Sequence, residues 1–167
     1  MTGERMMEMR EYRQGDLEAV MALANQAWRP IRKMSREALG DFISDIFNPA
    51  GDALSKGLQV KAQIDGGNYR IAVCEHEGRI VGFITYAVSG DIAEICNNAA
   101  DGNAGVKGIG QTMYRYVLDE CKRAGAKVVK VTTGLDWAHA PARRAYERAG
   151  FRKHLDSTTY FMELEQE

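Results

Sequence analysis

Gly108 and Gly110 lie in a loop that is predicted to run directly into a helix, since residues 105–112 read Gly-Val-Lys-Gly-Ile-Gly-Gln-Thr. A tight backbone of this kind directs several amide N–H groups to one point, with the positive end of the helix dipole behind them. That arrangement can hold a pyrophosphate. Further along, residues 145–151 read Ala-Tyr-Glu-Arg-Ala-Gly-Phe and place Tyr146 one turn before a glycine that ends a helix.

Two familiar phosphate-binding loops do not match this sequence. A Walker A loop needs Gly-Lys followed by Ser or Thr at the start of the helix, whereas Gly110 is followed by Gln111 and Thr112. A dinucleotide fingerprint has the order G-x-G-x-x-G, and the order here is G-x-x-G-x-G. ATP and NAD are therefore weak candidates for the ligand.

The bulk composition restricts the partners of the chain. Its net charge of −1 lacks the basic footprint of a nucleic-acid binder. The apolar runs are too short to cross a bilayer, and no secretory signal is apparent at the N-terminus. Three isolated cysteines predict no disulfide framework, and the scattered histidines predict no metal site. We expect one domain spanning residues 1–167, located in the cytoplasm.

The first part of the chain is predicted to contain a strand and two or three helices. The strand covers residues 6–13, and Asp16 is a good N-cap for an amphipathic helix that Pro30 should stop. Ser35 can cap a second helix that ends before Pro49. Residues 50–68 are expected to form a short helix followed by a loop.

The second part is predicted to alternate between strands and helices. The expected strands are 69–74, 79–88, 92–100 and 127–132, with one or two more in 151–164. Glu77-Gly78 is a hairpin turn, and Gly125 ends a helix that covers residues 109–124. A further helix runs from Pro141 to Gly150. The result is an α/β fold with a mixed sheet of about six to seven strands and helices on both faces.

These motifs resemble those of the GNAT superfamily of acyl-coenzyme A-dependent N-acetyltransferases. The family's cofactor loop reads Arg/Gln-x-x-Gly-x-Gly/Ala, and its second signature reads Asn-x-x-Ala-x-x-x-Tyr-x-x-x-Gly-Phe. Gly108 and Gly110 match the loop, with Asp101 on the expected acidic position and Ala100 on the usual valine. The second signature is matched by Ala142, Tyr146, Gly150 and Phe151. The predicted element order agrees from residue 6 to residue 164.

The resemblance implies that acetyl-coenzyme A lies where strands 92–100 and 127–132 diverge, with its pyrophosphate on the amides of residues 105–111. The residues expected to bind it are Ala99, Ala100, Gly105, Val106, Lys107, Gly108, Ile109, Gly110, Gln111, His139 and Arg143. Gly105 and His139 depart from the pattern, which has Arg or Gln and Asn there. Loss of one charge-assisted bond costs about 1.5–3 kcal/mol, and Lys107 can supply part of that charge.

The resemblance also assigns chemical roles. A lysine-like amine is ammonium at pH 7, and its deprotonation costs roughly 4–5 kcal/mol, so a nearby carboxylate helps as a general base. Glu94 is the candidate, on a strand where regular alternation places it on one face with Cys96 and Asn98. Tyr146 is the candidate general acid, or a hydrogen-bond donor to the thiolate while water delivers the proton. Trp28 and Asn98 are candidates for the substrate pocket.

Three hypotheses follow for the function. The first is an N-acetyltransferase that moves an acetyl group to a primary amine by direct attack, because no nucleophile–base pair is visible apart from Cys96. The second is a sensor that binds acyl-coenzyme A and transfers nothing. The third is an interaction protein that does not bind the cofactor. The expected acceptor is the amine of a small molecule or a peptide, and a homodimer is expected because homodimers are frequent in proteins of this fold.

Overall fold

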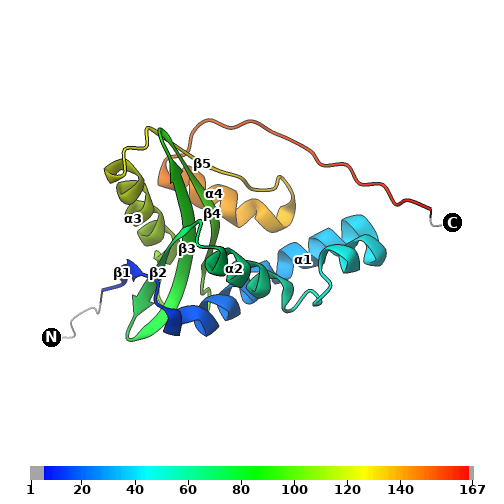
Figure 1. Cartoon of the computed structure of the whole chain (residues 1–167), viewed down its shortest axis with the longest axis horizontal. Helices are drawn as coiled ribbons and strands as arrows, with labels where there is room; N and C mark the ends of the chain where they lie inside the picture. Colours follow the sequence, from blue (N-terminus) through cyan, green and yellow to red (C-terminus); the bar gives the residue numbers. More distant parts are fainter. Residues whose placement is uncertain (1–5, 166–167) are drawn as a thin grey trace.

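A five-stranded mixed sheet forms the centre of the chain in the computed structural model, which describes residues 6–165 (Figure 1). The strands are β1 (Glu8–Glu11), β2 (Arg70–His76), β3 (Arg79–Ser89), β4 (Ile92–Ala100) and β5 (Val128–Val131). They lie in sequence order, and neighbours are antiparallel except for the parallel pair β4–β5. The α/β class is confirmed, with five strands instead of six or seven.

Helices cover both faces of the sheet. They are α1 (Leu17–Phe47), α2 (Ser55–Gly66), α3 (Ile109–Arg123) and α4 (Ala140–Ala149), with short 3-10 helices at Gln14–Asp16 and Trp137–His139. Figure 1 shows α3 on one side of the sheet and α1 with α2 on the other. In the described part of the chain, no helix is both long and apolar enough to cross a membrane.

Each face has its own apolar core. On the α3–α4 face, Ile109, Met113, Val117 and Cys121 of α3 are buried against the sheet, as their helical spacing predicts. Gly82 of β3 faces the same helix, and a Cβ there would lie 2.8 Å from the sulfur of Met113. On the α1–α2 face, the buried cluster consists of Val20, Leu23, Ala24, Val60, Val73, Phe83 and Ala99.

The glycine-based turns are confirmed. Glu77 and Gly78 both have positive φ, 52° and 77°, and join β2 to β3, as a tight hairpin turn requires. Gly125 and Gly150 have left-handed φ of 92° and 114° directly after α3 and α4. The predicted short helix within residues 50–68 is α2.

The prediction that Pro30 ends the first helix is wrong. α1 continues through Pro30 and Ser35 to Phe47, and its one interruption is at Gly40, with φ 78° and ψ 172°. A proline removes one backbone hydrogen bond and kinks a helix but does not always end it. Gly40 adopts a backbone conformation that is unfavourable for any residue with a Cβ.

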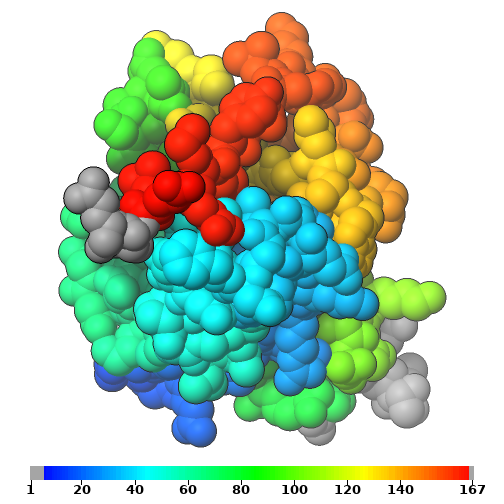
Figure 2. All heavy atoms as spheres, turned by 90° about the vertical axis from the view of Figure 1, so that its right-hand side faces the viewer, coloured from blue at the N-terminus to red at the C-terminus, as the bar shows by residue number. Residues whose placement is uncertain are grey.

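The strands expected within residues 151–164 are also absent. Residues 151–165 have no regular secondary structure and run along the outside of the domain. Figure 2 shows this segment in red beside the cyan end of α1. A strand exists only when a second strand accepts its backbone hydrogen bonds, and this segment does not pair with β5 in the described chain.

Candidate functional site

A β-bulge in β4 lies at the centre of the candidate site. Thr85 of β3 pairs with Asn97 and Tyr86 pairs with Ile95, so Cys96 is an extra residue without a partner on β3. The pairing of β4 with β5 stops at the same level, at Ile95, although β4 continues to Ala100. The two parallel strands are therefore no longer paired beyond the bulge. A bulge of this kind redirects the side chains that follow it.

The bulge places Glu94 and Asn98 on opposite faces of the sheet. Glu94 lines a cavity together with Gln59 and Gln63 of α2, whereas Asn98 is hydrogen-bonded to side chains of α3 and α4. The expectation that Glu94 and Asn98 share a face is therefore wrong. It assumed regular alternation, and one inserted residue reverses the orientation of every later side chain.

The cavity on the α1–α2 face has a volume of about 420 Å³. Its lining is mostly polar and comes from α2, β3, β4 and the residues after α2 and β5, namely Gln59, Gln63, Asn68, Tyr69, Ala87, Glu94, Ile95, Cys96, Asn97 and Thr132. Cys96 and Thr132 directly follow Ile95 and Val131, the last residues that β4 and β5 pair. The cavity therefore reaches the point where the two strands separate.

Glu94 is the one carboxylate in this lining. Its side chain is 42% exposed, and its Oε2 lies 3.4 Å from the ammonium nitrogen of Lys130 on β5. The carboxylate thus already binds one amine-type group. Nearby, burial and the charge of Glu94 raise the pKa of the Cys96 thiol. The thiol is therefore kept protonated and is a poor nucleophile.

Tyr146 lies on the opposite face, in a buried network of three side chains. The Asn98 Nδ2 donates a hydrogen bond to the hydroxyl oxygen of Tyr146 at 2.9 Å, and the Tyr114 hydroxyl donates to Asn98 Oδ1 at 2.8 Å. The rings of Tyr114 and Tyr146 are also in contact, with centroids 5.4 Å apart. Burial raises the pKa of both tyrosines, although hydrogen bonds from Asn98 and Tyr114 oppose this for Tyr146.

The glycine-rich loop joins β4 to α3. Gly105 and Gly108 have φ of 73° and 84°, and Gly108 is the N-cap residue of α3. The first backbone hydrogen bond of the helix runs from the Thr112 N–H to the Gly108 carbonyl. Within the described chain, the N–H groups of residues 105–111 therefore have no backbone acceptor. They form a cluster of donors at the positive end of a helix.

The side chains of this loop take different positions. Ile109 is buried, Val106 packs on the α3–α4 core, and Lys107 is exposed. Gln111 donates a hydrogen bond to the Ala145 carbonyl and so ties α3 to α4. At the end of β4, Ala100 is exposed.

His139 and Arg143 both contact the loop before α4. The His139 Nδ1 lies 2.7 Å from a carboxylate oxygen of Asp136, and Arg143 donates to the carbonyls of Gly134 and Asp136. Burial tends to raise the pKa of Asp136, but its hydrogen bonds with His139 hold it below its usual value. These contacts fix His139 at the N-terminus of α4.

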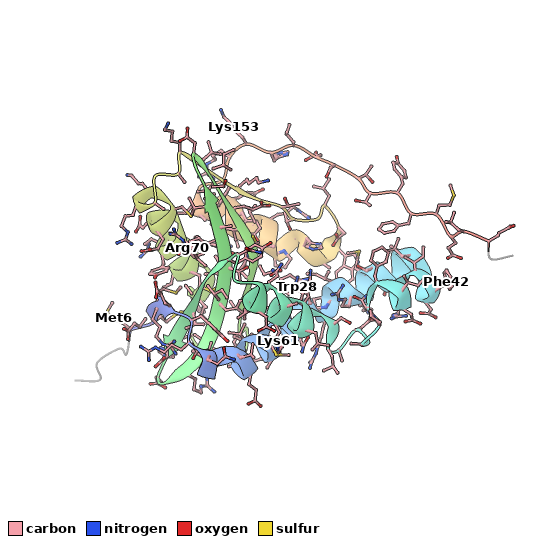
Figure 3. All side chains as sticks on the ribbon, viewed as in Figure 1. Met6, Trp28, Phe42, Lys61, Arg70 and Lys153 are labelled. Atoms are coloured by element: carbon pink, nitrogen blue, oxygen red, sulfur yellow. The ribbon has the colours of Figure 1, made fainter. Side chains whose placement is uncertain are left out.

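Trp28 is a residue of α1 whose ring contacts Lys56 of α2, and it is not part of the cavity lining (Figure 3). The ammonium of Lys56 is 4.2 Å from the centre of its ring and also donates to Gln59. Burial and the neighbouring Arg32 lower the pKa of Lys56 to about 8. Trp28 thus contacts the cavity only indirectly, through Lys56 and Gln59.

Sequence reasoning missed the polar residues of α2 and the role of Tyr114. Gln59 and Gln63 are spaced by one turn of a helix, a pattern that also occurs on any solvated helix face. Tyr114 lies one turn after Gly110, but helical periodicity suggests only a core residue. Among the described residues, no group of three His, Cys, Asp or Glu side chains could hold a metal ion.

Comparison with known proteins identifies the family. The sequence profile of the Acetyltransferase (GNAT) family matches residues 31–151, so the chain belongs to this family. No curated protein matches the chain.

Solved structures share the fold. A mutant of the BH1408 protein from Bacillus halodurans has a TM-score of 0.70 at 16% identity, covering 93% of this chain and 99% of the other. A GNAT acetyltransferase from Brucella melitensis, in complex with acetyl-CoA, has a TM-score of 0.62 at 18% identity over 89% and 84% of the two chains. An aminoglycoside acetyltransferase from an uncultured soil metagenomic sample, in complex with sisomicin, has a TM-score of 0.61 at 16% identity over 95% and 97%.

Proposed function

We propose that this chain transfers the acetyl group of acetyl-coenzyme A to a primary amine by direct attack. The observation that carries the proposal is the placement of three features around the end of the β4–β5 pairing. Free N–H groups lie in the loop after β4, a buried tyrosine hydroxyl is bonded to Asn98 just past the bulge, and Glu94 faces a polar cavity on the other side.

The loop fits the cofactor. Two adjacent phosphates need several donors that converge, and the N–H groups of residues 105–111 have no backbone acceptor in the described chain. The side chain that Gly105 lacks is not needed for these backbone bonds. Ala100, His139 and Arg143 are proposed to line the remainder of the cofactor site, together with the main chain of Ala99, whose side chain is buried in the α1–α2 core. When bound, acetyl-coenzyme A would supply the reactive thioester.

Glu94 is proposed to act as the general base. An acceptor amine in the cavity would take the place that the Lys130 ammonium holds beside Glu94. As its nitrogen forms a bond to the acetyl carbon and the carbon–sulfur bond breaks, the amine loses a proton to Glu94, directly or through water. The raised pKa of Cys96 supports direct attack, because a protonated thiol does not form an acyl-enzyme.

Tyr146 is proposed to stabilise the departing sulfur. Its raised pKa keeps the hydroxyl protonated at neutral pH, and its oxygen accepts the Asn98 hydrogen bond. The hydroxyl can therefore donate a hydrogen bond to the thiolate sulfur, while water delivers the proton, because a tyrosine with a raised pKa is a weaker acid than a thiol. Asn98 then serves to orient Tyr146. The described contacts do not place Asn98 or Trp28 in the acceptor cavity, so we assign acceptor binding to Gln59, Gln63 and Asn97.

The proposal is tested by thiol release from acetyl-coenzyme A with a panel of amines, which includes amino acids, polyamines and aminoglycosides. The panel contains aminoglycosides because one protein of the same fold is named for that activity. Thiol release that depends on one amine class, with the acetylated product found by mass spectrometry, supports the proposal. Tight binding of acetyl-coenzyme A without turnover of any amine would favour a sensor instead.

A further inference from the structure

Two cations lie close together on the α1–α2 face without a carboxylate of their own. Lys56, the second residue of α2, is 6% exposed. In the described chain its ammonium interacts with neutral groups, the Gln59 side-chain oxygen at 3.0 Å and the Trp28 ring at 4.2 Å. Arg32 lies one turn after Trp28 on α1, and its charge helps to lower the pKa of Lys56 to about 8. The two positive charges therefore repel each other in a largely buried place.

Arg32 also lacks an acceptor for its guanidinium. Its Nε is buried and has no hydrogen-bond partner in the described chain. Burial lowers the pKa of Arg32, and the carboxylate that opposes this effect is that of Asp52. Arg36 already binds both oxygens of that carboxylate, at 2.8 and 3.0 Å. Because a buried donor without an acceptor costs free energy, an added anion would stabilise this guanidinium.

Arg36, one turn further along α1, shows the contrast. Its guanidinium binds three carboxylates at 2.8–2.9 Å, those of Asp41, Asp45 and Asp52. The chain thus supplies several aspartates for one arginine of this helix and none that binds Arg32 or Lys56. Lysine and arginine are seldom buried without a partner, and charged groups with shifted pKa values gather at functional sites. The two cations therefore have the character of an anion site.

This cation pair is one side chain away from the cavity that Glu94 lines. Gln59 accepts the hydrogen bond of Lys56 and also lines the cavity. Lys56, Gln59 and Gln63 are spaced by three and four residues on α2, so they share one face of the helix. With about 1.5 Å of rise per residue, that face spans roughly 10 Å. A ligand with its anionic group at the cations and its amine in the cavity would extend along this face.

We propose that Arg32 and Lys56 bind the carboxylate of the acceptor, so that the substrate is an amino acid whose reacting amine is several bonds from its carboxylate. The planar fork of a guanidinium matches a carboxylate, and the ammonium adds a second charge. Lys56 also lies in the first turn of α2, at the positive end of the helix dipole. The substrate class rests on the proposed function, whereas the anion site depends only on the two cations.

The experiment compares each amino acid with the diamine that lacks only its carboxylate, lysine with cadaverine and ornithine with putrescine. Calorimetry at neutral pH measures their binding with coenzyme A absent and present. Coenzyme A carries no acetyl group, so no transfer can occur. One charge-assisted contact changes affinity by about ten- to hundredfold, so we expect each amino acid to bind at least about tenfold more tightly than its diamine.

Arg32→Met and Lys56→Met are the test variants, and Arg29→Met is the matched control, because Arg29 is an exposed cation of the same helix. Each test variant removes a cation that no carboxylate binds, so both should remain folded, which thermal unfolding verifies. We expect either substitution to weaken amino acid binding about tenfold or more and to leave diamine binding unchanged. The control should bind all of these amines as the unchanged protein does.

Equal affinities within each pair would overturn the carboxylate site, and so would a preference that survives in both test variants. No binding of any of these amines at millimolar concentration would also overturn it. Tighter binding of phosphorylethanolamine than of either amino acid would assign the cations to phosphate and overturn the carboxylate assignment.

The proposed function can fail separately from the anion site. If the amino acids bind as expected but acetyl-coenzyme A is not consumed, the anion site stands and the acetyltransferase proposal does not. If amines are acetylated without regard to their carboxylate, the acetyltransferase proposal stands and the substrate class is wrong.

Discussion

The two faces of the sheet build their halves of the candidate site in different ways. On the α3–α4 side, the donors are main-chain N–H groups whose positions depend on the left-handed φ of Gly105 and Gly108. On the α1–α2 side, the cavity is lined mainly by polar side chains of α2 and β4. A backbone site leaves a glycine pattern in the sequence. A side-chain site can change residue by residue while the fold persists, and it leaves no comparable pattern.

The largest effect on activity is expected on the α1–α2 side of the sheet, where Glu94 lines the cavity. We expect Glu94→Gln to lower kcat by about 10²–10⁴, the usual contribution of a general base, while the affinity for acetyl-coenzyme A stays unchanged. Steady-state thiol release and calorimetry measure the two quantities. Lys130→Met is the matched control, since it removes only the ion pair with Glu94. Equal losses in both variants would assign the effect to the ion pair instead of base catalysis.

Tyr146→Phe tests the opposite face. We expect a fall in kcat of about a hundredfold, the lower end of the range for proton transfer, with little change in acetyl-coenzyme A affinity. Tyr114→Phe deletes the neighbouring buried hydroxyl that donates to Asn98 and should cost less. If kcat of Tyr146→Phe equals that of the unchanged protein, water alone protonates the thiolate and Tyr146 is a packing residue.

Lys56 should limit stability on the cavity side. Its pKa is lowered to about 8 by burial and by Arg32. Below pH 8 the buried ammonium is charged, and keeping it charged lowers the free energy of unfolding. We expect Lys56→Met to raise the free energy of unfolding by about 1–2 kcal/mol at pH 7, because the lost contact with Trp28 offsets part of the gain.

The change of folding stability with pH tests whether the charge of Lys56 is the cause. Between about pH 8 and the ordinary lysine pKa of 10.5, the unfolded chain binds more protons at Lys56 than the folded chain does. The stability contribution of the unchanged lysine therefore rises with pH in this window. The advantage of Lys56→Met should shrink over the same window in urea titrations. An advantage that stays constant with pH would show that packing, not charge, causes it.

The smallest effect is expected in the loop. Gly108→Ala places a Cβ on a residue with φ 84°, which costs roughly 1–2 kcal/mol, so acetyl-coenzyme A should bind about tenfold more weakly. Gly102→Ala is the matched control, because Gly102 has no positive φ and open space around it. Equal affinities in the two variants would mean that the loop conformation does not determine cofactor binding.

The same contrast explains what the sequence could predict. The turn at Glu77-Gly78, the buried face of α3 and the glycine ends of α3 and α4 depend on local backbone preferences, and all are confirmed. The bulge at Cys96 depends on how β4 pairs with β3. The alternation of residues along one strand gives no sign of an inserted residue. The prediction therefore placed Glu94 and Asn98 on the same face, although the bulge puts them on opposite faces.

Two further misses have similar causes. Proline was expected to end the first helix, but packing of α1 against α2 and the sheet maintains the helix through Pro30, and Gly40 takes up the bend. Residues 158–162 are of types that favour strands, yet strand formation also needs a partner strand, which propensity does not specify. The prediction of strands within residues 151–164 was therefore wrong.

The most direct test is thermal unfolding of the full chain with acetyl-coenzyme A, ATP or NAD added separately. A ligand at about 100 times its dissociation constant stabilises a protein by about 2.7 kcal/mol, which is a shift of several degrees for a chain of this length. We predict this shift with acetyl-coenzyme A and none with ATP or NAD. No shift with acetyl-coenzyme A, or equal shifts with all three ligands, would contradict the cofactor site and the acetyltransferase proposal with it.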